Sequence, residues 1–150
     1  MNGEGSRRFG GRWNPKGIAM VYASLTPEVA MAEALANNRY YGIPVEDAMP
    51  RTFVAIDVRL SRVLDLRSAL AWNALGIELH DLKHVDWRLE ATKGIEPLTQ
   101  KIGRAAHARR WEGLVVPSAA AEGHNLLVLP EHLGNGSSIR IRHPDRLTPS

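Results

Sequence analysis

Residues 10–17 read Gly10-Gly11-Arg12-Trp13-Asn14-Pro15-Lys16-Gly17, and this glycine-bounded segment is the most distinctive stretch of the chain. Together with residues 1–9 it carries little that a core could bury, so the start of the chain is predicted to be either a disordered leader or a loop shaped around a ligand. In such a loop, backbone N–H groups and the Arg12 guanidinium could together hold a phosphate or pyrophosphate. The alternative, which residue type alone slightly favours, is that Arg12 ties down a turn through backbone carbonyls.

The pattern outward from this segment predicts a mixture of strands and helices. Residues 18–24 form an apolar run of strand length, and Thr26, Pro27 and Glu28 form a helix start, so a helix is predicted over 27–38. Two further helices are predicted over 68–79 and about 97–110, and Gly113 is expected to break the second of them. Residues 80–94 give no clear pattern. Further strands are predicted over 52–58, 63–66, 114–116, 126–129 and 139–141. Without regular strand–helix alternation, this order predicts an α+β fold of mainly antiparallel sheets flanked by helices.

The composition limits the class of protein. A chain of 150 residues is long enough for one domain with an ordinary core, so residues 1–150 are expected to form a single domain. The absence of cysteine excludes thiol nucleophiles, thiolate metal sites and disulfides. No apolar run approaches the roughly 20 residues of a membrane-spanning helix, and the polar start lacks a secretory signal, so we expect a soluble cytoplasmic protein without membrane contact.

The formal net charge of +3 is a small excess of 19 Lys and Arg over 16 Asp and Glu; the basic residues are scattered between acidic ones and form only short clusters. A nucleic-acid-binding surface would require a continuous basic stripe with interleaved aromatic residues, and the sequence has none. Direct nucleic-acid binding is therefore not expected. An anionic small molecule is the better-matched ligand.

Three familiar catalytic patterns do not occur. The glycines before Arg12 do not follow a strand and open a helix, so there is neither a dinucleotide fingerprint nor a P-loop. His80 and His84 are four residues apart without a third ligand, which favours a surface or core histidine pair over a metal site. No Gly-x-Ser-x-Gly segment is present that would place a hydrolase serine.

Four polar residues remain as candidates, each with a structural alternative. Tyr22 offers a ring for stacking, or it is a half-buried strand tyrosine. Glu33 lies among small apolar residues of the predicted helix, which is unusual for a solvated face, although an exposed glutamate is the common case. Ser118 follows a predicted strand and Asn125 precedes one, so each could contact a ligand or hydrogen-bond its own turn. For each of these residues taken singly, the structural interpretation is favoured over the functional one.

The order in which these residues occur resembles the RES domain family, the toxins of RES–Xre toxin–antitoxin systems, named for Arg, Glu and Ser residues. The resemblance covers most of the chain, and its Gly-Gly-Arg-Trp-Asn-Pro block is specific. The matching segments are Gly3-Glu4-Gly5, residues 10–17, Tyr22, Ala32-Glu33, Thr99-Gln100-Lys101-Ile102-Gly103, residues 113–118 and Asn125.

This resemblance implies an ADP-ribosyltransferase-like fold whose cleft takes NAD+ as a substrate, without a metal. Family members look like enzymes that break the nicotinamide–ribose bond by hydrolysis or phosphorolysis, which arrests growth. By position, Glu33 would stabilise an oxocarbenium-like ribose and Arg12 would neutralise the pyrophosphate. Tyr22 would stack on or position the nicotinamide ring, and Ser118 would hydrogen-bond the ligand. Further contacts with the nucleotide are expected from Gly11, Asn14, Gly17 and Asn125.

The resemblance also implies a cognate Xre-family antitoxin, with which the chain would form a hetero-oligomer. Two alternative functions are an ADP-ribosyltransferase that modifies a cellular protein and a non-catalytic fold that only binds its antitoxin. Family members usually carry a further strand, with an additional arginine, before the segment that matches Gly3-Glu4-Gly5. Met1 lies only two residues before Gly3 here, and Arg7 and Arg8 do not match the arginine convincingly, so the chain is expected to lack the strand.

Overall fold

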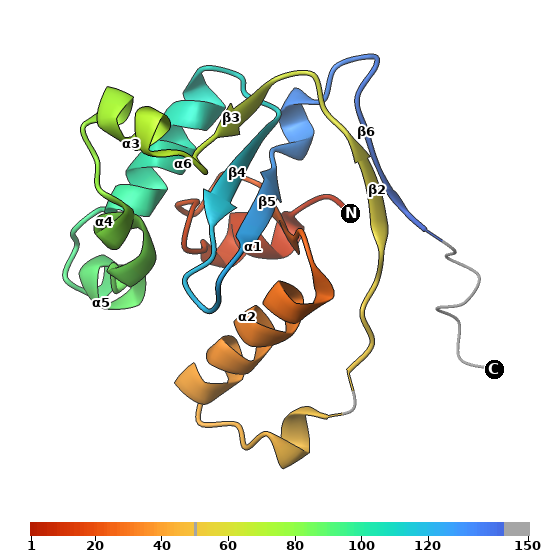
Figure 1. Ribbon diagram of the computed structural model, residues 1–150, viewed down its shortest axis with the longest axis vertical. Helices are drawn as coiled ribbons and strands as arrows, with labels where there is room; N and C mark the ends of the chain where they lie inside the picture. The colour runs from red at the N-terminus through yellow and green to blue at the C-terminus, as the bar shows by residue number, and fades with distance from the viewer. Residues whose placement is uncertain (50, 143–150) are drawn as a thin grey trace.

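The computed structural model of the chain describes residues 1–49 and 51–142. The elements are α1 (Glu4–Phe9), β1 (Val21–Ser24), α2 (Pro27–Tyr40), β2 (Ile56–Arg59), β3 (Val63–Asp65), α3 (Ala69–Leu75), α4 (Leu79–His84), α5 (Trp87–Thr92), α6 (Leu98–Ala108), β4 (Gly113–Pro117), β5 (His124–Val128) and β6 (Ser138–Ile141), with 3-10 turns at Glu46–Ala48 and Pro130–His132. Helices α3 to α6 lie together on one side of the central strands, and the β2–β6 pair lies on the other (Figure 1).

The strands form a four-stranded sheet in the order β1-β5-β4-β3 and a two-stranded sheet of β2 and β6. Strand β5 pairs antiparallel with both β1 and β4, and β2 pairs antiparallel with β6. Strand β3 runs parallel to β4. The predicted α+β fold with mainly antiparallel sheets is therefore confirmed, with one parallel pair at the end of the larger sheet.

The core lies around the two central strands, β4 and β5. Leu114, Val116, Leu127 and Val128 of these strands have no exposed surface, which is the pattern of strands covered on both faces. Trp13, from the glycine-bounded segment, is 2% exposed and belongs to the same apolar cluster. Residues 10–17 are thus anchored to the core by their own tryptophan.

Helix α1 occupies part of the segment that the sequence predicted to be a leader or a loop, so that prediction was wrong for residues 4–9. None of its six residues is buried, so it lacks the apolar period from which a helix is recognised. Long-range hydrogen bonds hold it instead. The Ser6 hydroxyl donates to the Met20 carbonyl (2.6 Å) and accepts from the Met20 N–H (2.8 Å).

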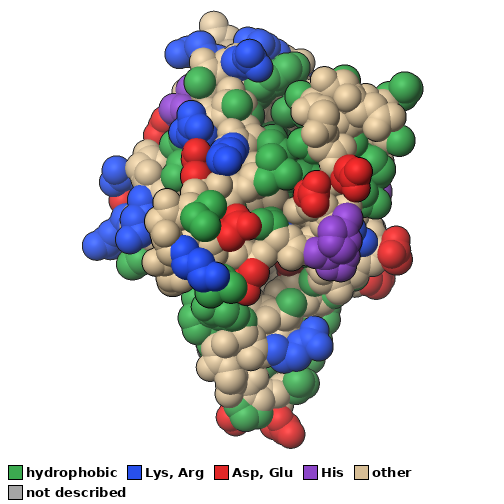
Figure 2. Space-filling view, turned by 90° about the vertical axis from the view of Figure 1, so that its left-hand side faces the viewer, with side chains coloured by type: hydrophobic (Ala, Val, Ile, Leu, Met, Phe, Trp, Pro, Cys, Tyr) green, Lys and Arg blue, Asp and Glu red, His purple; other side chains and the backbone are tan. Residues whose placement is uncertain are grey.

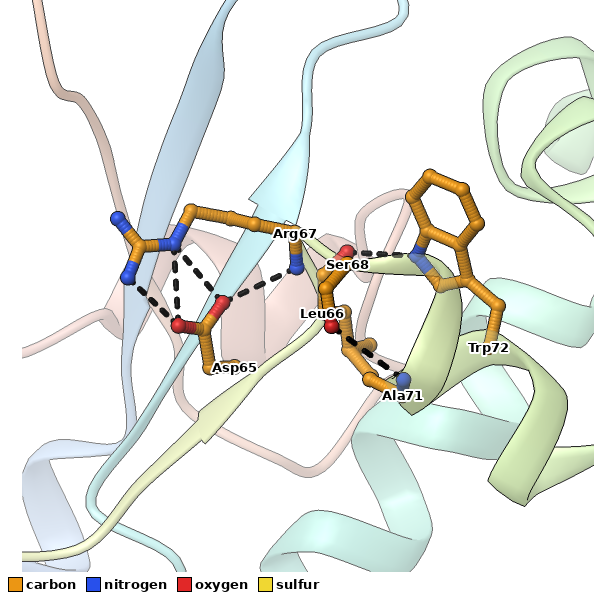
Figure 3. Close-up of polar contacts among 6 residues, drawn as sticks. All are labelled: Asp65, Leu66, Arg67, Ser68, Ala71 and Trp72. Atoms are coloured by element: carbon orange, nitrogen blue, oxygen red, sulfur yellow. Dashed lines mark hydrogen bonds and ion pairs between the residues drawn. The ribbon is translucent and has the colours of Figure 1, made fainter.

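The helix predicted over 68–79 ends earlier, at Leu75, because Gly76 adopts a left-handed backbone (φ 66°) that closes the helix. Ser68 caps its N-terminus, as its position predicts, and accepts from the Ala71 N–H (3.4 Å). Figure 3 shows this turn between β3 and α3, where the Trp72 indole donates to the Leu66 carbonyl (2.7 Å). The cap and the indole contact together fix α3 against the end of β3.

Two further predictions are corrected or completed by the structure. The unassigned stretch 80–94 forms the two short helices α4 and α5. Gly113 does not break the preceding helix, which already ends at Ala108; it is the first residue of β4. A side chain at Gly113 would lie 2.8 Å from the Leu127 carbonyl oxygen, so a glycine is needed for close strand packing there.

Within the described residues, no helix has the length and apolar composition needed to cross a membrane.

Glu112 is a buried carboxylate (4% exposed) that joins three loops at the start of β4. It accepts hydrogen bonds from the Ser61 N–H (2.5 Å), the Gly134 N–H (3.0 Å) and the Ser137 hydroxyl (2.8 Å). These donors, led by the Ser61 N–H, favour the ionised form and lower the pKa of Glu112 to about 2. The folded state therefore favours the charged carboxylate more strongly than the unfolded chain does.

We expect Glu112→Gln to lower the free energy of unfolding at neutral pH by about 3 kcal/mol, since a tenfold change in an acid dissociation constant corresponds to about 1.4 kcal/mol. Because the pKa is depressed on folding, this stabilisation is complete above the ordinary value of 4.5 and is lost as the pH falls toward 2. Urea unfolding at several pH values should show wild type and variant converging in acid. The matched control Glu122→Gln removes an exposed carboxylate; a pH-independent gap for Glu112→Gln would contradict the assignment.

Candidate active site

A cleft of about 430 Å³ opens between the glycine-bounded segment, β1, α2, α5 and the loop after β4. It is lined by five of the residues that the sequence singled out, which come from four separate regions of the chain. These are Gly11, Arg12, Tyr22, Glu33 and Asn125. The fold thus brings together residues whose roles could not be decided one at a time.

Glu33 is positioned by a hydrogen-bond network that joins α2 to the central sheet. Its Oε1 accepts from the Ser118 hydroxyl (2.7 Å) and from the Asn125 side-chain amide (2.6 Å). The side-chain oxygen of Asn125, Oδ1, in turn accepts from the Ser24 hydroxyl (2.7 Å). Strands β1 and β5 set this geometry, because Ser24 and Asn125 face each other in their antiparallel register.

The second carboxylate oxygen of Glu33, Oε2, has no hydrogen-bond partner within the described residues. One oxygen of the carboxylate is therefore fixed by the protein, while the other remains available to a ligand in the cleft. An anionic oxygen held in this way can stabilise positive charge that develops on a bound molecule, and it requires little reorganisation to do so.

Arg12 makes the contacts expected of a loop arginine and also lines the cleft. Its Nη2 donates to the carbonyls of Leu82 and Lys83 (2.8 Å each), and its Nη1 donates to the Val85 carbonyl (3.2 Å). Burial lowers the pKa of Arg12, and the charge of Glu33 opposes that shift. Two of the five guanidinium N–H groups have no acceptor among the described residues, so the side chain can still bind an anion.

Tyr22 is held by its hydroxyl and exposed along its ring. The hydroxyl donates to Asn14 Oδ1 (2.7 Å) and accepts from the Trp13 N–H (2.9 Å). Burial of this group raises the pKa of Tyr22 well above its usual value, yet the residue as a whole is 43% exposed. Gly11 allows the arrangement, because a side chain there would lie 2.6 Å from the Tyr22 hydroxyl oxygen. The free ring is therefore presented to the cleft with a fixed orientation.

Helix α6 anchors the backbone of the glycine-bounded segment through side-chain hydrogen bonds and close packing. The Gln100 amide donates to the Gly11 carbonyl (2.8 Å), and the Thr99 hydroxyl donates to the Arg12 carbonyl (2.6 Å). One turn further along, Gly103 contacts the segment directly, since a side chain there would lie 1.7 Å from the Trp13 carbonyl oxygen. The Thr99 to Gly103 motif of the sequence thus positions the segment rather than contacting the cleft.

Three residues expected to contact the ligand do not line the cleft. Ser118 has no exposed surface, and its only hydroxyl proton goes to Glu33. Asn14 is also fully buried, and its side chain bonds Tyr22 and the Ile18 carbonyl. Gly17 is exposed, and its N–H donates to the Arg7 carbonyl. Ser118 and Asn14 are thus placed to orient residues that do line the cleft, whereas Gly17 closes the segment onto α1.

Arg7 and Arg8 also lie outside the cleft lining. Arg7 forms an exposed ion pair with Glu4 (2.7 Å), and the Arg8 guanidinium lies over the Phe9 ring. Neither supplies a second arginine to the cleft, as expected from their positions in the sequence.

The sequence did not single out four further residues of the cleft, Asn37, Tyr41, Trp87 and Arg88. Trp87 and Arg88 belong to α5, a helix of six residues in the stretch that gave no clear pattern. Asn37 could have been found from helical spacing, since it lies four residues after Glu33 and therefore on the same face of α2.

A second hollow, of about 270 Å³, lies beside α4 and is lined by His80, Asp81, His84 and Glu90. Figure 2 shows a patch of histidine side chains with acidic side chains near it on this face of the molecule. The two imidazole rings lie 4.6 Å apart, as the four-residue spacing predicts. Across the described ranges, 1–49 and 51–142, no three His, Asp or Glu side chains are arranged to hold a metal ion.

Comparison with known proteins gives a consistent set of relatives. The profile of the RES domain family matches residues 1–148. The NAD(+) phosphorylases MbcT of Mycobacterium tuberculosis and Mycobacterium bovis are 29% identical over 153 aligned positions, which cover 100% of this chain and 77% of each relative. A crystal structure of the M. tuberculosis MbcT–MbcA toxin–antitoxin complex matches with a TM-score of 0.76 and 30% identity, over 95% of this chain and 74% of that one.

Proposed function

The chain belongs to the RES domain family, and from this premise we propose that it is the toxin of a toxin–antitoxin pair and degrades NAD+. The ADP-ribosyltransferase-like fold implied by the sequence agrees with the structural match to MbcT. The bond broken is the one between nicotinamide and ribose. The acceptor is inorganic phosphate, by similarity to relatives that are NAD(+) phosphorylases.

The observation that carries this proposal is the hydrogen bonding of the two carboxylate oxygens of Glu33. Its Oε1 is fixed by Ser118 and Asn125, while Oε2 has no partner in the described part of the chain. Departure of nicotinamide leaves positive charge shared between C1 and the ring oxygen of the ribose. A carboxylate oxygen beside that carbon, or one that grips a ribose hydroxyl, lowers the energy of this state more than that of the bound substrate. Glu33 is therefore the proposed catalytic residue.

Arg12 and Tyr22 are proposed to bind two parts of the substrate in the cleft that Glu33 also lines, the pyrophosphate and the nicotinamide. The free N–H groups of Arg12 suit the pyrophosphate, whose charge would compensate the desolvation of the guanidinium. The exposed ring of Tyr22 suits the flat nicotinamide, which it would stack on or position. Asn125 and the Gly11 backbone complete the nucleotide site, and the site uses no metal.

Ser118 and Asn14 are proposed as positioning residues. Ser118 orients Glu33 through its hydroxyl proton, and the N–H groups of Ala120 and Ala121 hold the serine oxygen (3.1 and 3.2 Å). Asn14 orients Tyr22 in the same indirect way. This differs from the direct ligand contacts that the sequence led us to expect for both residues.

The relative of known structure is in complex with an antitoxin, MbcA, and we propose that this chain likewise forms a hetero-oligomer with a cognate antitoxin of the Xre family. Such a partner would keep NAD+ breakdown in check until it is removed. DNA binding would belong to the antitoxin, since the chain itself has no continuous basic stripe.

Induced expression in bacteria tests the proposed function in cells. We expect growth to stop and the intracellular NAD+ concentration, measured by an enzymatic cycling assay, to fall before growth slows. Expression of Glu33→Gln to the same level is the matched control and should leave both unchanged. Growth arrest by wild type at an unchanged NAD+ concentration would overturn the proposal.

A further inference from the structure

Arg88 is a cleft arginine whose contacts leave its donors largely unused. Its guanidinium carbon lies 4.0 Å from the centre of the Tyr40 ring and 4.5 Å from that of the Trp87 ring, and 5.9 Å from that of Tyr41. Its one hydrogen bond within the described residues runs from Nη2 to Asn37 Oδ1 (3.0 Å). Aromatic faces stabilise a cation without using its N–H groups, so four of the five donors remain available.

No carboxylate of the described ranges forms an ion pair with Arg88. The two nearest acidic residues in sequence are Asp86 and Glu90, and Asp86 uses its Oδ1 to cap α5 through the Leu89 N–H (3.0 Å). An arginine that is partly buried, held by three rings and left without an anionic partner is arranged to take an anion from outside the protein.

The contact with Asn37 places this anion-binding group near the proposed catalytic carboxylate. Asn37 follows Glu33 by four residues on α2, so their side chains lie on one face about 5–6 Å apart at Cβ. Both line the cleft, as does Arg88. Burial lowers the pKa of Arg12, the charge of Glu33 raises it, and the charge of Arg88 lowers it further. The three charged groups therefore lie within electrostatic range of one another.

We propose that Arg88, with Asn37, binds the inorganic phosphate that accepts the ADP-ribosyl group. This inference rests on the proposed function, and it assigns the second substrate to Arg88 and Asn37 rather than to Arg12. A phosphate oxygen forms a bond to C1 of the ribose as the bond from C1 to the pyridinium nitrogen breaks. The electron pair of the broken bond goes to that nitrogen, which gives neutral nicotinamide and ADP-ribose that carries the phosphate on C1.

The two arginines then bind different anions: Arg12 binds the pyrophosphate of NAD+, and Arg88 binds the inorganic phosphate. The Arg12 guanidinium is tied to the end of α4 through the Leu82 carbonyl, whereas the Arg88 guanidinium contacts Asn37 of α2. Because Asn37 lies one helical turn from Glu33, a phosphate held by Arg88 and Asn37 would lie near the carbon that Glu33 stabilises. Loss of Arg88 should leave NAD+ bound and leave its carbon to be attacked by water instead.

Steady-state kinetics of Arg88→Gln test this assignment, with phosphate varied at saturating NAD+ and NAD+ varied at saturating phosphate. We expect the KM for phosphate to rise about tenfold or more and the KM for NAD+ to stay within about twofold of wild type. Chromatography of the products should show a shift from phosphorylated ADP-ribose toward free ADP-ribose. Arg88→Lys keeps the charge without the planar donors and should fall between wild type and Arg88→Gln.

Arg109→Gln is the matched control, because it removes an exposed arginine beyond α6 and should change neither KM. Thermal unfolding of all variants monitors the fold. A rise in the KM for NAD+ with an unchanged KM for phosphate would assign Arg88 to the dinucleotide and overturn the inference, as would no change in either. In both cases nicotinamide is still released, whereas failure of the proposed function would show as no release by wild type at any phosphate concentration.

Discussion

Replacement of Glu33 by glutamine is expected to slow nicotinamide release from NAD+ by about 10²–10³-fold, the usual cost of one preorganised electrostatic contact in a transition state. Glutamine keeps the shape of the side chain, and its Oε1 can still accept from Ser118 and Asn125. The variant replaces the charged oxygen that faces the cleft with an uncharged NH2 group, so the negative charge is lost while the two hydrogen bonds at Oε1 remain. We therefore expect kcat to fall while the KM for NAD+ changes little, as measured by steady-state nicotinamide release.

Glu28→Gln is the matched control on the same helix, since Glu28 lies exposed in the first turn of α2. It should have wild-type kcat and KM. A Glu33→Gln enzyme with a kcat close to that of wild type would mean that the ionised carboxylate does not act in the reaction. A rise confined to KM would assign Glu33 to ground-state binding instead.

Gly103→Ala is expected to have the largest effect on the fold. The added carbon would lie 1.7 Å from the Trp13 carbonyl oxygen, far inside van der Waals contact, and the neighbour is backbone that cannot rotate away. Either α6 or residues 11–13 must shift, which would break the Thr99 and Gln100 contacts to that segment. We expect at least about 3 kcal/mol of destabilisation, or roughly 10 °C in melting temperature for a chain of this size.

The displaced segment also carries Arg12 and the Tyr22 contacts, so any folded Gly103→Ala protein should show lower activity. Gly5→Ala is the matched control, because a side chain at Gly5 meets nothing within 4 Å. Thermal unfolding by circular dichroism compares the two variants with wild type. Equal melting temperatures for Gly103→Ala and Gly5→Ala would show that α6 does not pack on Trp13 as described.

The sequence predicted those elements whose signals are local. Helix α2 has its Thr26 cap and Pro27 at the first position, and the buried strands β4 and β5 are short apolar runs. Helix α1 has no buried residue, and α4 and α5 have six residues each, too few for a clear apolar period. These short helices are held by tertiary contacts, such as those of Ser6, which a sequence pattern does not contain.

The site was predictable only in part for the same reason. The resemblance singled out Arg12, Tyr22 and Glu33, and the structure places all three at one cleft. The resemblance did not indicate that Ser118 orients Glu33 instead of contacting the ligand, because that depends on where the end of β4 meets α2 in space. Arg88 was missed, because its significance comes from the aromatic rings and the Asn37 amide around it rather than from its neighbours in sequence.

The most direct test of the central claim is nicotinamide release by the purified protein from NAD+, followed by chromatography with and without phosphate. We predict release by wild type, with phosphorylated ADP-ribose as the second product when phosphate is present, and about 10²–10³-fold slower release by Glu33→Gln. No release by folded wild-type protein under either condition would contradict the claim that this cleft cleaves NAD+.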